Sequence, residues 1–334
     1  MLLGLVMCLG CESRAPAPNG VPRPVQLQLN WIPDAQHGGF LAAETDGCFA
    51  AEGLDIAIKS GGPGTPVLQK LAMGQVDFAI ANADQVLLAR AQGADVVALF
   101  AALQNSPRCV MVRESSGIET LDQLHDLTLA LGEGKAFAEF LKSHVPLERV
   151  RVVPYVGSVA AFLAQEDYAQ QGYVFSEPLV VRALGVPVRA LMVSDLGFNP
   201  YSSCVVTRSE MIEQHPEIVA KTISAIARGW QIYLESPEKA NAEIRVRNSD
   251  MPAEILAQAA SEVARLVQPG DLSFSRDRSP SHSLGRMTRQ RWQQLADQLV
   301  ELGMLDEQAL QVDDAFTNRF LPSAQAIVPS EAPR

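Results

Sequence analysis

The sequence has little positive charge and few of the residues that build reactive centres. Its 334 residues include 27 Lys and Arg against 38 Asp and Glu, which gives a formal net charge of −11. Binding to a phosphate backbone requires a basic face, so this balance excludes a nucleic-acid partner. The five cysteines do not form the two closely spaced pairs of a structural metal site. We therefore expect no metal and no other cofactor.

Long hydrophobic runs are also missing, because no apolar stretch approaches the roughly 20 residues that span a bilayer. The N-terminus nevertheless begins with an apolar decapeptide, Met1 to Gly10, followed by Cys11 and a polar, Pro-rich segment. This order resembles a bacterial lipoprotein signal, with residues 1–11 as the signal, Cys11 as the lipidated residue and 12–24 as a flexible tether. The alternative is a disordered N-terminus. We expect export to the periplasm or cell surface and a lipid anchor in the membrane.

From Val25 onward, strand and helix patterns alternate, as they do in sheets covered by helices. Beyond Val205 the pattern becomes helical. The predicted strands are Val25–Asn30, Leu54–Lys59, Val76–Ala81, Val96–Leu103, Cys109–Arg113, Leu127–Leu131, Val150–Pro154, Gly172–Phe175 and Val188–Val193. The predicted helices include Gly38–Ala51, Asp84–Gln92, Ser209–His215, Glu217–Glu235, Pro237–Arg247, Pro252–Leu266 and Met287–Gly303.

Two successive α/β units and a helical C-terminal region indicate a bilobed protein whose chain crosses twice between the lobes. The crossings are predicted at Gln104–Arg108 and Phe198–Cys204. Lobe 1 then comprises 25–105 with 204–320, lobe 2 comprises 106–203, and 321–334 form a loose tail. Because the crossing segments should run side by side, we hypothesise a disulfide between Cys109 and Cys204. The alternative is two buried thiols.

Five ordered motifs resemble one family, the thiamine-pyrimidine synthase-like family of ABC transporter periplasmic solute-binding proteins, which is related to receptors for sulfonates, taurine and nitrate. The motifs are Leu29-Asn-Trp-Ile-Pro-Asp-Ala-Gln-His-Gly-Gly-Phe40, Gly47-Cys-Phe-Ala-Ala-Glu-Gly-Leu-Asp55, Gly74-Gln-Val-Asp-Phe-Ala-Ile80, Leu88-Ala-Arg-Ala-Gln-Gly93 and Gly172-Tyr-Val-Phe-Ser-Glu-Pro178. The resemblance implies a type II periplasmic-binding fold, two α/β lobes joined by a two-segment hinge. It also implies a monomeric, substrate-binding component that works with an ABC permease and an ATPase.

The same family contains a fungal enzyme that makes the pyrimidine from a histidine of its own chain and pyridoxal phosphate. Its cysteine-rich motif falls where this chain has Pro200-Tyr-Ser-Ser-Cys204, and only Cys204 remains of that cluster. A pyridoxal site also needs a Schiff-base lysine, and the strand that leads to Asn82 supplies none. We therefore predict a binding protein and no catalytic residues, with a pyrimidine-synthesis enzyme as the weaker alternative.

Pockets favour lobe interfaces and the carboxyl ends of parallel strands, so polar and aromatic residues just after strands are the ligand-binding candidates. Trp31 offers a ring for stacking on a planar ligand, and the alternative is packing beneath a loop. His37 is placed to donate to a ligand or to face water at a helix end. Lys135 follows a glycine-rich loop at a helix start. The ten candidates are Asn30, Trp31, His37, Asn82, Asp84, Gln104, Lys135, Tyr173, Glu177 and Tyr201.

Two acidic candidates bear on the type of ligand. Asp84 either caps a helix or, if Asn82 takes that role, accepts from an amino group of the ligand. Glu177 precedes Pro178, which holds it extended, and it either binds a ring N–H or is a solvated loop charge. With aromatic walls, these carboxylates favour a neutral or cationic planar solute such as a thiamine pyrimidine precursor. The alternatives are riboflavin or an anion such as a sulfonate, taurine or nitrate, for which basic groups are expected instead.

Overall fold

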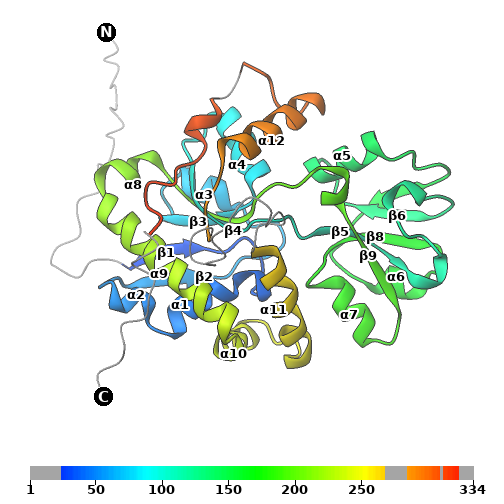
Figure 1. Ribbon diagram of the computed structural model, residues 1–334, viewed down its shortest axis with the longest axis horizontal. Helices are drawn as coiled ribbons and strands as arrows, with labels where there is room; N and C mark the ends of the chain where they lie inside the picture. Colours follow the sequence, from blue (N-terminus) through cyan, green and yellow to red (C-terminus); the bar gives the residue numbers. More distant parts are fainter. Residues whose placement is uncertain (1–23, 268–283, 309–310, 323–334) are drawn as a thin grey trace, which may run out of the picture.

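The computed structural model describes residues 24–267, 284–308 and 311–322. The predicted signal, Cys11 and most of the tether lie outside these residues, as do Pro269–Ser283 and most of the predicted tail. Figure 1 shows two lobes of unequal size, each built around one sheet. No helix in the part of the chain that the structure describes is both long and apolar enough to cross a membrane.

The sheet of the larger lobe has five strands in the order β2-β1-β3-β10-β4. Its strands are β1 (Val25–Gln28), β2 (Ile56–Lys59), β3 (Phe78–Ala81), β4 (Val97–Leu103) and β10 (Ser202–Thr207). Strand β1 pairs in parallel with β2 and β3, whereas β10 runs antiparallel to β3 and β4. The parallel strands therefore bring their carboxyl ends to one edge of the sheet.

The sheet of the smaller lobe repeats this plan in the order β7-β6-β8-β5-β9. Its strands are β5 (Arg108–Arg113), β6 (Thr128–Leu131), β7 (Arg151–Pro154), β8 (Tyr168–Tyr173) and β9 (Val188–Met192). Here β5 is the antiparallel strand, between β8 and β9. Each antiparallel strand is the first one that the chain forms after it passes into that sheet. The chain thus crosses between the lobes twice, once between β4 and β5 and once between β9 and β10.

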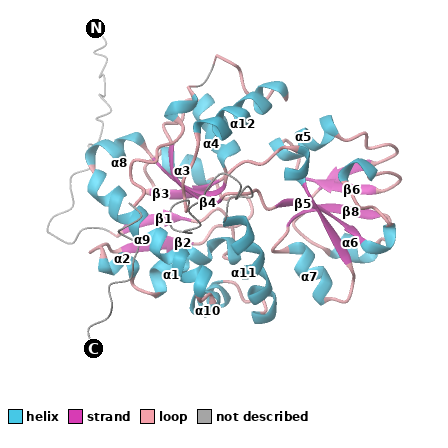
Figure 2. Cartoon of the chain, in the orientation of Figure 1, coloured by secondary structure: helices cyan, strands magenta, loops and turns pink. Residues whose placement is uncertain are grey.

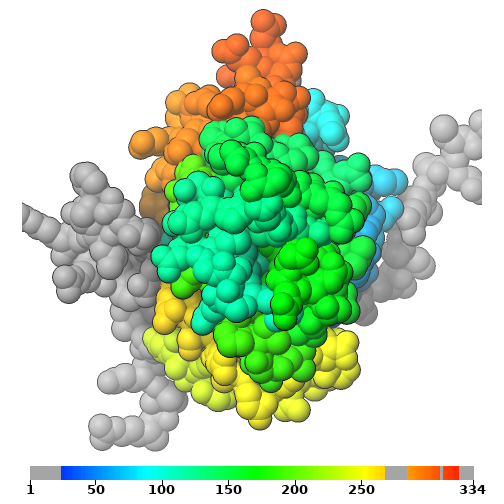
Figure 3. Space-filling model, turned by 90° about the vertical axis from the view of Figure 1, so that its right-hand side faces the viewer, coloured from blue at the N-terminus to red at the C-terminus, as the bar shows by residue number. Residues whose placement is uncertain are grey.

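Helices cover both sheets (Figure 2). The larger lobe carries α1 (Gly38–Thr45), α2 (Cys48–Ala51), α3 (Val67–Ala72), α4 (Ala83–Ala91), α8 (Ser209–Gln214), α9 (Pro216–Glu235), α10 (Glu238–Arg247), α11 (Ala253–Val267) and α12 (Arg289–Glu301). The smaller lobe carries α5 (Ala136–His144), α6 (Ala160–Ala164) and α7 (Glu177–Ala183). Short 3-10 turns are η1 (Ala35–His37), η2 (Glu114–Ser116), η3 (Leu121–Gln123), η4 (Val193–Leu196) and η7 (Val312–Asp314). Viewed end-on in Figure 3, the smaller lobe faces the reader, with α12 above it and α10 and α11 below.

Helices α1 and α9 approach closely because glycines line their contact. A Cβ atom on Gly229 would lie 2.3 Å from the carbonyl oxygen of Gly39, closer than any real Cβ contact. A Cβ on Gly39 would in turn meet the ring of Trp230 at 2.2 Å. That ring is fully buried against Phe40, edge to face at 5.5 Å between centroids. This contact fixes the position of α1, and with it the loop after β1.

The two segments that join the lobes are tied to each other by side chains. The chain leaves the larger sheet after Leu103 and returns to it at Ser202. The side chain of Asn199 accepts from the Ser106 N–H at 2.7 Å and donates to the Asn105 side chain at 2.9 Å. From α12, the guanidinium of Arg291 donates to the carbonyls of Gln104 at 2.6 Å and of Asn199 at 2.8 Å. A single helix therefore holds both connections.

Three sequence predictions need correction. Strand β10 was not predicted, because Ser202–Thr207 was assigned to a crossing and to the start of the helical region, yet it pairs on both sides. The predicted helix Gly38–Ala51 is two helices, because Gly47 has a left-handed φ of 69° that interrupts it. The strand predicted at Gly172–Phe175 begins at Tyr168 and ends at Tyr173.

The hypothesised disulfide between Cys109 and Cys204 is also wrong. Both cysteines are fully buried free thiols, as is Cys48. Cys109 lies in β5 opposite Gly172 and Met192, whereas Cys204 lies in β10 opposite Ala81 and Ala101. The two residues belong to different sheets, each beyond its own connection, so side-by-side connections do not bring the sulfur atoms together.

Candidate functional site

Sequence-predicted residues from both lobes meet where strands end at the junction of the two sheets. Asn82 follows β3 in the larger lobe, and Tyr173 ends β8 in the smaller lobe. The Asn82 amide donates to the Tyr173 hydroxyl at 3.3 Å. This hydrogen bond joins the two lobes directly, and we take the surrounding residues as the candidate site.

Asn82 is held in place by its own lobe. It is the N-cap residue of α4, and its N–H donates to the side chain of Gln85 at 3.0 Å. Its side-chain oxygen accepts from the backbone N–H of Ser203 at 3.2 Å. Ser203 is buried and has a φ of 50°, in the left-handed region that non-glycine residues avoid. The strained residue in β10 therefore aims the donor of Asn82 across the junction.

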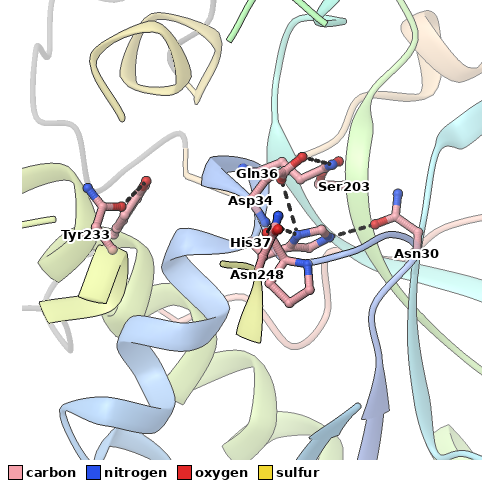
Figure 4. Close-up of polar contacts among 9 residues, drawn as sticks. Asn30, Asp34, Gln36, His37, Ser203, Tyr233 and Asn248 are labelled. Carbon is pink, nitrogen blue, oxygen red and sulfur yellow. Dashed lines mark hydrogen bonds and ion pairs between the residues drawn. The ribbon is translucent and has the colours of Figure 1, made fainter. Parts of the chain in front are cut away.

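A polar network lies beside this point on the loop after β1 (Figure 4). The ring of His37 is fully buried, and its Nδ1 accepts from the N–H of Asp34 at 3.2 Å. Its Nε2 must then carry the proton and donate to the Asn30 side chain at 2.8 Å. Both nitrogens of His37 are thus engaged within the protein, and the ring neither faces water nor offers a free donor. Its role in this arrangement is to position Asn30.

The same network reaches β10 through Gln36. Asp34 accepts from both the backbone N–H and the side-chain amide of Gln36, each at 3.1 Å. The side-chain oxygen of Gln36 accepts from the hydroxyl of Ser203 at 3.3 Å. On the opposite side of the loop, Asn248 donates to the carbonyl of Pro33 at 2.8 Å. These contacts fix the loop that carries Trp31, whose side chain stays open with 40% of the residue exposed.

In the smaller lobe, Tyr173 covers a guanidinium. The Arg108 Cζ lies 4.3 Å from the centroid of the Tyr173 ring and 4.5 Å from that of the Phe137 ring. Such cation–π contacts contribute about 0.5–2 kcal/mol each, depending on how far they are desolvated. Phe175 packs edge to face on Tyr173 at 5.4 Å between centroids. The tyrosine therefore connects an aromatic cluster to Asn82 of the other lobe.

Glu177 begins α7 beneath Tyr173. Its Oε2 accepts from the N–H of Tyr173 at 2.8 Å, and its Oε1 accepts from the hydroxyl of Tyr155 at 2.8 Å. The same hydrogen bond, burial and the charge of Glu177 raise the pKa of Tyr155, with burial as the largest cause. The carboxylate is thus already bound inside its own lobe, although each oxygen has a remaining lone pair. A Cβ on Gly172 would press on it at 3.1 Å.

Asp84 is the second residue of α4, two positions after Asn82, and it does not cap the helix. Its Oδ1 is buried and has no hydrogen-bond partner among the described residues. Burial raises the pKa of this carboxyl. The charge of Arg108, hydrogen bonding to the backbone N–H groups of Gln85 and Asp84, and the charge of Lys135 oppose the rise in part. Both basic residues belong to the smaller lobe. The unsatisfied oxygen therefore faces the same junction as Tyr173.

The remaining predicted residues lie at different distances from this junction. Lys135 precedes α5, where its ammonium group makes no hydrogen bond or ion pair within the described ranges. Gln104 is buried and its amide donates to the carbonyls of Ala101 and Arg286, each at 3.1 Å. Tyr201 is buried against α12, where its hydroxyl accepts from the Thr288 N–H at 3.0 Å. Gln104 and Tyr201 thus support the connections between the lobes in this structure.

The structure adds residues that sequence reasoning did not single out. In the smaller lobe Phe137 stacks on Arg108 and Tyr155 donates to Glu177, and in the larger lobe Ser203 orients Asn82. Arg108 ends the predicted crossing Gln104–Arg108 and is not among the ten candidates, although its place directly after Pro107 at the start of a strand was a signal. Phe137 and Tyr155 carried no pattern that separates them from core residues.

Other features of the described residues offer no competing centre. No three His, Cys, Asp or Glu side chains gather closely enough there to hold a metal ion. A surface hollow of about 520 Å³ is lined by Arg289, Gln290, Gln293, Gln294 and Asp297. All five residues belong to α12, and the hollow has no aromatic wall and no strand end. The junction of the two lobes remains the better candidate.

Comparisons with known proteins give sequence relatives over most of the chain. The riboflavin-binding protein RibY of Chloroflexus aurantiacus is 27% identical over 332 residues, covering 92% of this chain and 89% of the relative. The formylaminopyrimidine-binding protein of Halalkalibacterium halodurans is 23% identical over 328 residues, covering 95% and 97%. A 4-amino-5-hydroxymethyl-2-methylpyrimidine phosphate synthase of Legionella pneumophila is 24% identical over 310 residues, covering 89% and 92%.

Solved structures share the fold at low identity. The alkanesulfonate-binding protein SsuA of Xanthomonas axonopodis pv. citri superposes with a TM-score of 0.63 at 15% identity, covering 89% of this chain and 99% of that one. The nitrate-binding protein NrtA of Synechocystis PCC 6803 gives a TM-score of 0.65 at 14% identity, covering 90% and 88%. The fold is therefore the two-lobed α/β fold of periplasmic binding proteins, as predicted. Residues 34–240 match the family described as NMT1/THI5 like, and the chain belongs to that family.

Proposed function

We propose that this chain is the solute-binding component of an ABC importer and that its two lobes close around a small planar heteroaromatic solute. The observation that carries this proposal is the Asn82–Tyr173 hydrogen bond, which joins the lobes at their strand ends beside aromatic rings and unpaired charged groups. Ligand sites favour such positions between lobes. Two relatives named as binding riboflavin and formylaminopyrimidine support the ligand class, because both compounds contain a flat, nitrogen-rich ring.

A binding function is favoured over pyrimidine synthesis, although one relative is named as a synthase. A catalytic cysteine must be accessible as the thiolate, whereas Cys48, Cys109 and Cys204 are buried. Burial also raises the pKa of the Cys109 and Cys204 thiols. Both ring nitrogens of His37 are engaged within the protein. The residues at the junction are thus suited to hydrogen bonding and stacking more than to nucleophilic chemistry.

Export and anchoring form a second part of the proposal. The apolar decapeptide before Cys11 supports a lipoprotein signal, with the tether leading into β1 at Val25. The mature protein would then work at the membrane beside a permease and an ATPase, as a monomer. Metabolic labelling with a fatty acid tests the anchor. We expect label on the full chain and none on the Cys11→Ser variant, whereas equal labelling of both would contradict lipidation at Cys11.

A thermal-shift screen tests the ligand class. The soluble form beginning at Ser13 is heated with riboflavin, thiamine pyrimidine precursors, taurine or alkanesulfonates. A ligand that binds only the folded state stabilises it by about 2.7 kcal/mol at 100 times its Kd. We expect stabilisation by a planar heterocycle. Stabilisation by a sulfonate alone would contradict the planar-solute proposal, and turnover of a pyrimidine precursor would favour the synthase.

A further inference from the structure

Arg108 holds a charged group at the junction with its hydrogen-bonding capacity unused. The guanidinium is positioned between the faces of Phe137 and Tyr173. Among the residues that the structure describes, the guanidinium makes no hydrogen bond and no ion pair. The backbone N–H of Arg108 donates to the hydroxyl of Ser106. A guanidinium has five N–H donors, and leaving them unpaired near a lobe interface is costly. The two rings thus fix the plane of a donor group that lacks an acceptor.

Arg113 shows that this state is not a general property of arginines on strand β5. Its guanidinium also lies over a ring, at 5.3 Å from the centroid of Phe162. Unlike Arg108, it donates to the carbonyls of Phe162 at 2.8 Å and of Leu163 at 3.1 Å. Arg113 is therefore a structural arginine with satisfied donors. Arg108 has the same stacking and lacks the acceptors.

Asp84 supplies the complementary group from the other lobe. Its buried Oδ1 is an acceptor without a donor, and it interacts electrostatically with Arg108 and Lys135 without forming an ion pair to either in the described residues. The ammonium group of Lys135 also makes no ion pair in that part of the chain, but this residue is exposed, so water solvates it. Glu177, by contrast, already accepts one hydrogen bond on each oxygen. Two groups at the junction are therefore shielded from water without a full set of partners, the half-buried guanidinium of Arg108 as a donor and the Oδ1 of Asp84 as an acceptor.

We propose that Arg108 and Asp84 determine specificity by recognising an amide-type edge of a planar ligand, a carbonyl oxygen beside a ring N–H. Arg108 donates to the carbonyl, Asp84 accepts from the N–H, and Lys135 donates to a second carbonyl on the other side. The ligand class is then a heteroaromatic lactam or imide. This inference rests on the proposed solute-binding function and adds the chemistry of the ligand edge.

A sulfonate, an aminopyrimidine and a cyclic imide differ in how well they satisfy the polar groups at the junction. A sulfonate accepts from Arg108 and Lys135 but leaves the carboxylate of Asp84 buried beside a like charge. An aminopyrimidine offers N–H donors to Asp84 and one adjacent ring nitrogen, whose single lone pair accepts only one of the five donors of Arg108. A cyclic imide has two carbonyl oxygens flanking one N–H, so its N–H pairs with Asp84, one carbonyl offers two lone pairs to Arg108, and the second carbonyl is left for the exposed Lys135. Each unsatisfied buried group lowers affinity substantially, so the imide edge is the best match.

The test uses riboflavin, whose ring system contains an imide, and its N3-methyl derivative, which lacks the imide N–H. Binding to the form beginning at Ser13 is titrated by flavin fluorescence for the unmodified protein and the variants Asp84→Asn, Arg108→Met and Arg113→Met. We expect N3-methylation to weaken binding to the unmodified protein by about tenfold or more, because Asp84 then loses its donor. The Asp84→Asn variant keeps an amide oxygen that can accept from the N–H but loses the charge, so it should lose part of that discrimination. Arg108→Met should weaken riboflavin by a similar factor, whereas Arg113→Met should not.

The outcomes separate this inference from the proposed function. Equal affinity of the unmodified protein for both flavins overturns the role of Asp84 without any variant having to fold. Unchanged affinity in a folded Arg108→Met variant overturns the role of Arg108. Stabilisation by 4-amino-5-hydroxymethyl-2-methylpyrimidine, with no binding of riboflavin, overturns the imide edge and leaves the planar-solute function standing. Binding of taurine alone, or of no compound, overturns both.

Discussion

The guanidinium of Arg291 donates to the carbonyl of Asn199 at 2.8 Å and also to that of Gln104 at 2.6 Å. One side chain of α12 therefore bridges both segments between the lobes. The guanidinium also lies 3.9 Å from the centroid of the Tyr201 ring. Burial is the main cause that lowers the pKa of Arg291. In the proposed closure of the lobes these two segments form the hinge, so Arg291 is the side chain of α12 that we expect to define it.

Replacing Arg291 tests how strongly the connections depend on it. Arg291→Met removes two hydrogen bonds from a charged donor and leaves two carbonyls without partners, so we expect the free energy of unfolding to fall by about 2–4 kcal/mol. Urea denaturation followed by circular dichroism measures the change. Arg289→Met is the matched control, because its ion pair with Asp313 is exposed and should matter by less than about 0.5 kcal/mol. Equal effects of the two substitutions would show that Arg291 does not hold the connections.

Much of the fold could be predicted because local patterns and global architecture agree. The alternation of strand and helix signals indicated two α/β units, and the resemblance over most of the chain indicated how they are joined. Strand β10 was missed because it follows a connection and pairs with β3 and β4, which are distant in sequence. The sequence of Ser202–Thr207 carries β-branched residues, but their partners are visible only in three dimensions.

The candidate site was predictable in position but less so in detail. Residues after strand ends did meet at the junction, as Asn82, Asp84 and Tyr173 show. Whether a polar group is free depends on neighbours that the sequence does not place. His37 and Glu177 were predicted as ligand-binding residues, and the structure shows existing partners for both. Arg108 emerged as a free donor only when its stacking on two rings and lack of acceptors were known.

Gly229 should not tolerate even a methyl group. Gly229→Ala places a Cβ against the Gly39 carbonyl and the Ala43 side chain, so α1 and α9 must separate. We expect a loss of about 3 kcal/mol or more in the free energy of unfolding, at the upper end for overpacking. Thermal and urea denaturation measure it. The neighbouring exposed residue gives the control, since Arg228→Ala should change stability by less than about 0.5 kcal/mol. A fully stable Gly229→Ala protein would contradict the close helix contact.

Substitutions at Ser203 can measure the backbone strain in β10. The variants Ser203→Ala and Ser203→Gly both lose the hydroxyl that donates to Gln36. Only glycine adopts a φ of 50° without a steric penalty, so we expect the glycine variant to exceed the alanine variant by about 1 kcal/mol in unfolding free energy. Urea denaturation of the pair measures the difference. An alanine variant as stable as the glycine variant would mean that Ser203 is not strained.

The cysteines should be unreactive in the folded protein. The form beginning at Ser13 retains Cys48, Cys109 and Cys204, all buried and reduced. Burial raises the pKa of each thiol, which keeps the reactive thiolate scarce at neutral pH. We expect no rapid reaction with a thiol reagent in buffer and three reacting thiols after unfolding in denaturant. A single reacting thiol after unfolding would instead indicate a disulfide.

The carboxylate of Asp84 should lower the free energy of unfolding, and the size of this effect should depend on pH. Because burial raises its folded-state pKa above the ordinary value near 3.8, the charged form is disfavoured in the folded protein. The cost is present in full above the folded-state pKa and disappears as the pH falls to the unfolded value near 3.8. We therefore expect Asp84→Asn to be more stable than the unmodified protein at pH 7 and the difference to vanish towards pH 4, as measured by urea denaturation.

Asp126 provides a control of opposite sign for that measurement. Its pKa is lowered to about 2, chiefly by the hydrogen bond from Arg149. The folded state gains from this charged group above the unfolded value near 3.8, and the gain is lost as the pH falls towards 2. Asp126→Asn should therefore be less stable than the unmodified protein at pH 7. If Asp84→Asn were also less stable than the unmodified protein at pH 7, the carboxylate of Asp84 would have a stabilising partner within the protein. That result would contradict its proposed role as an acceptor for the ligand.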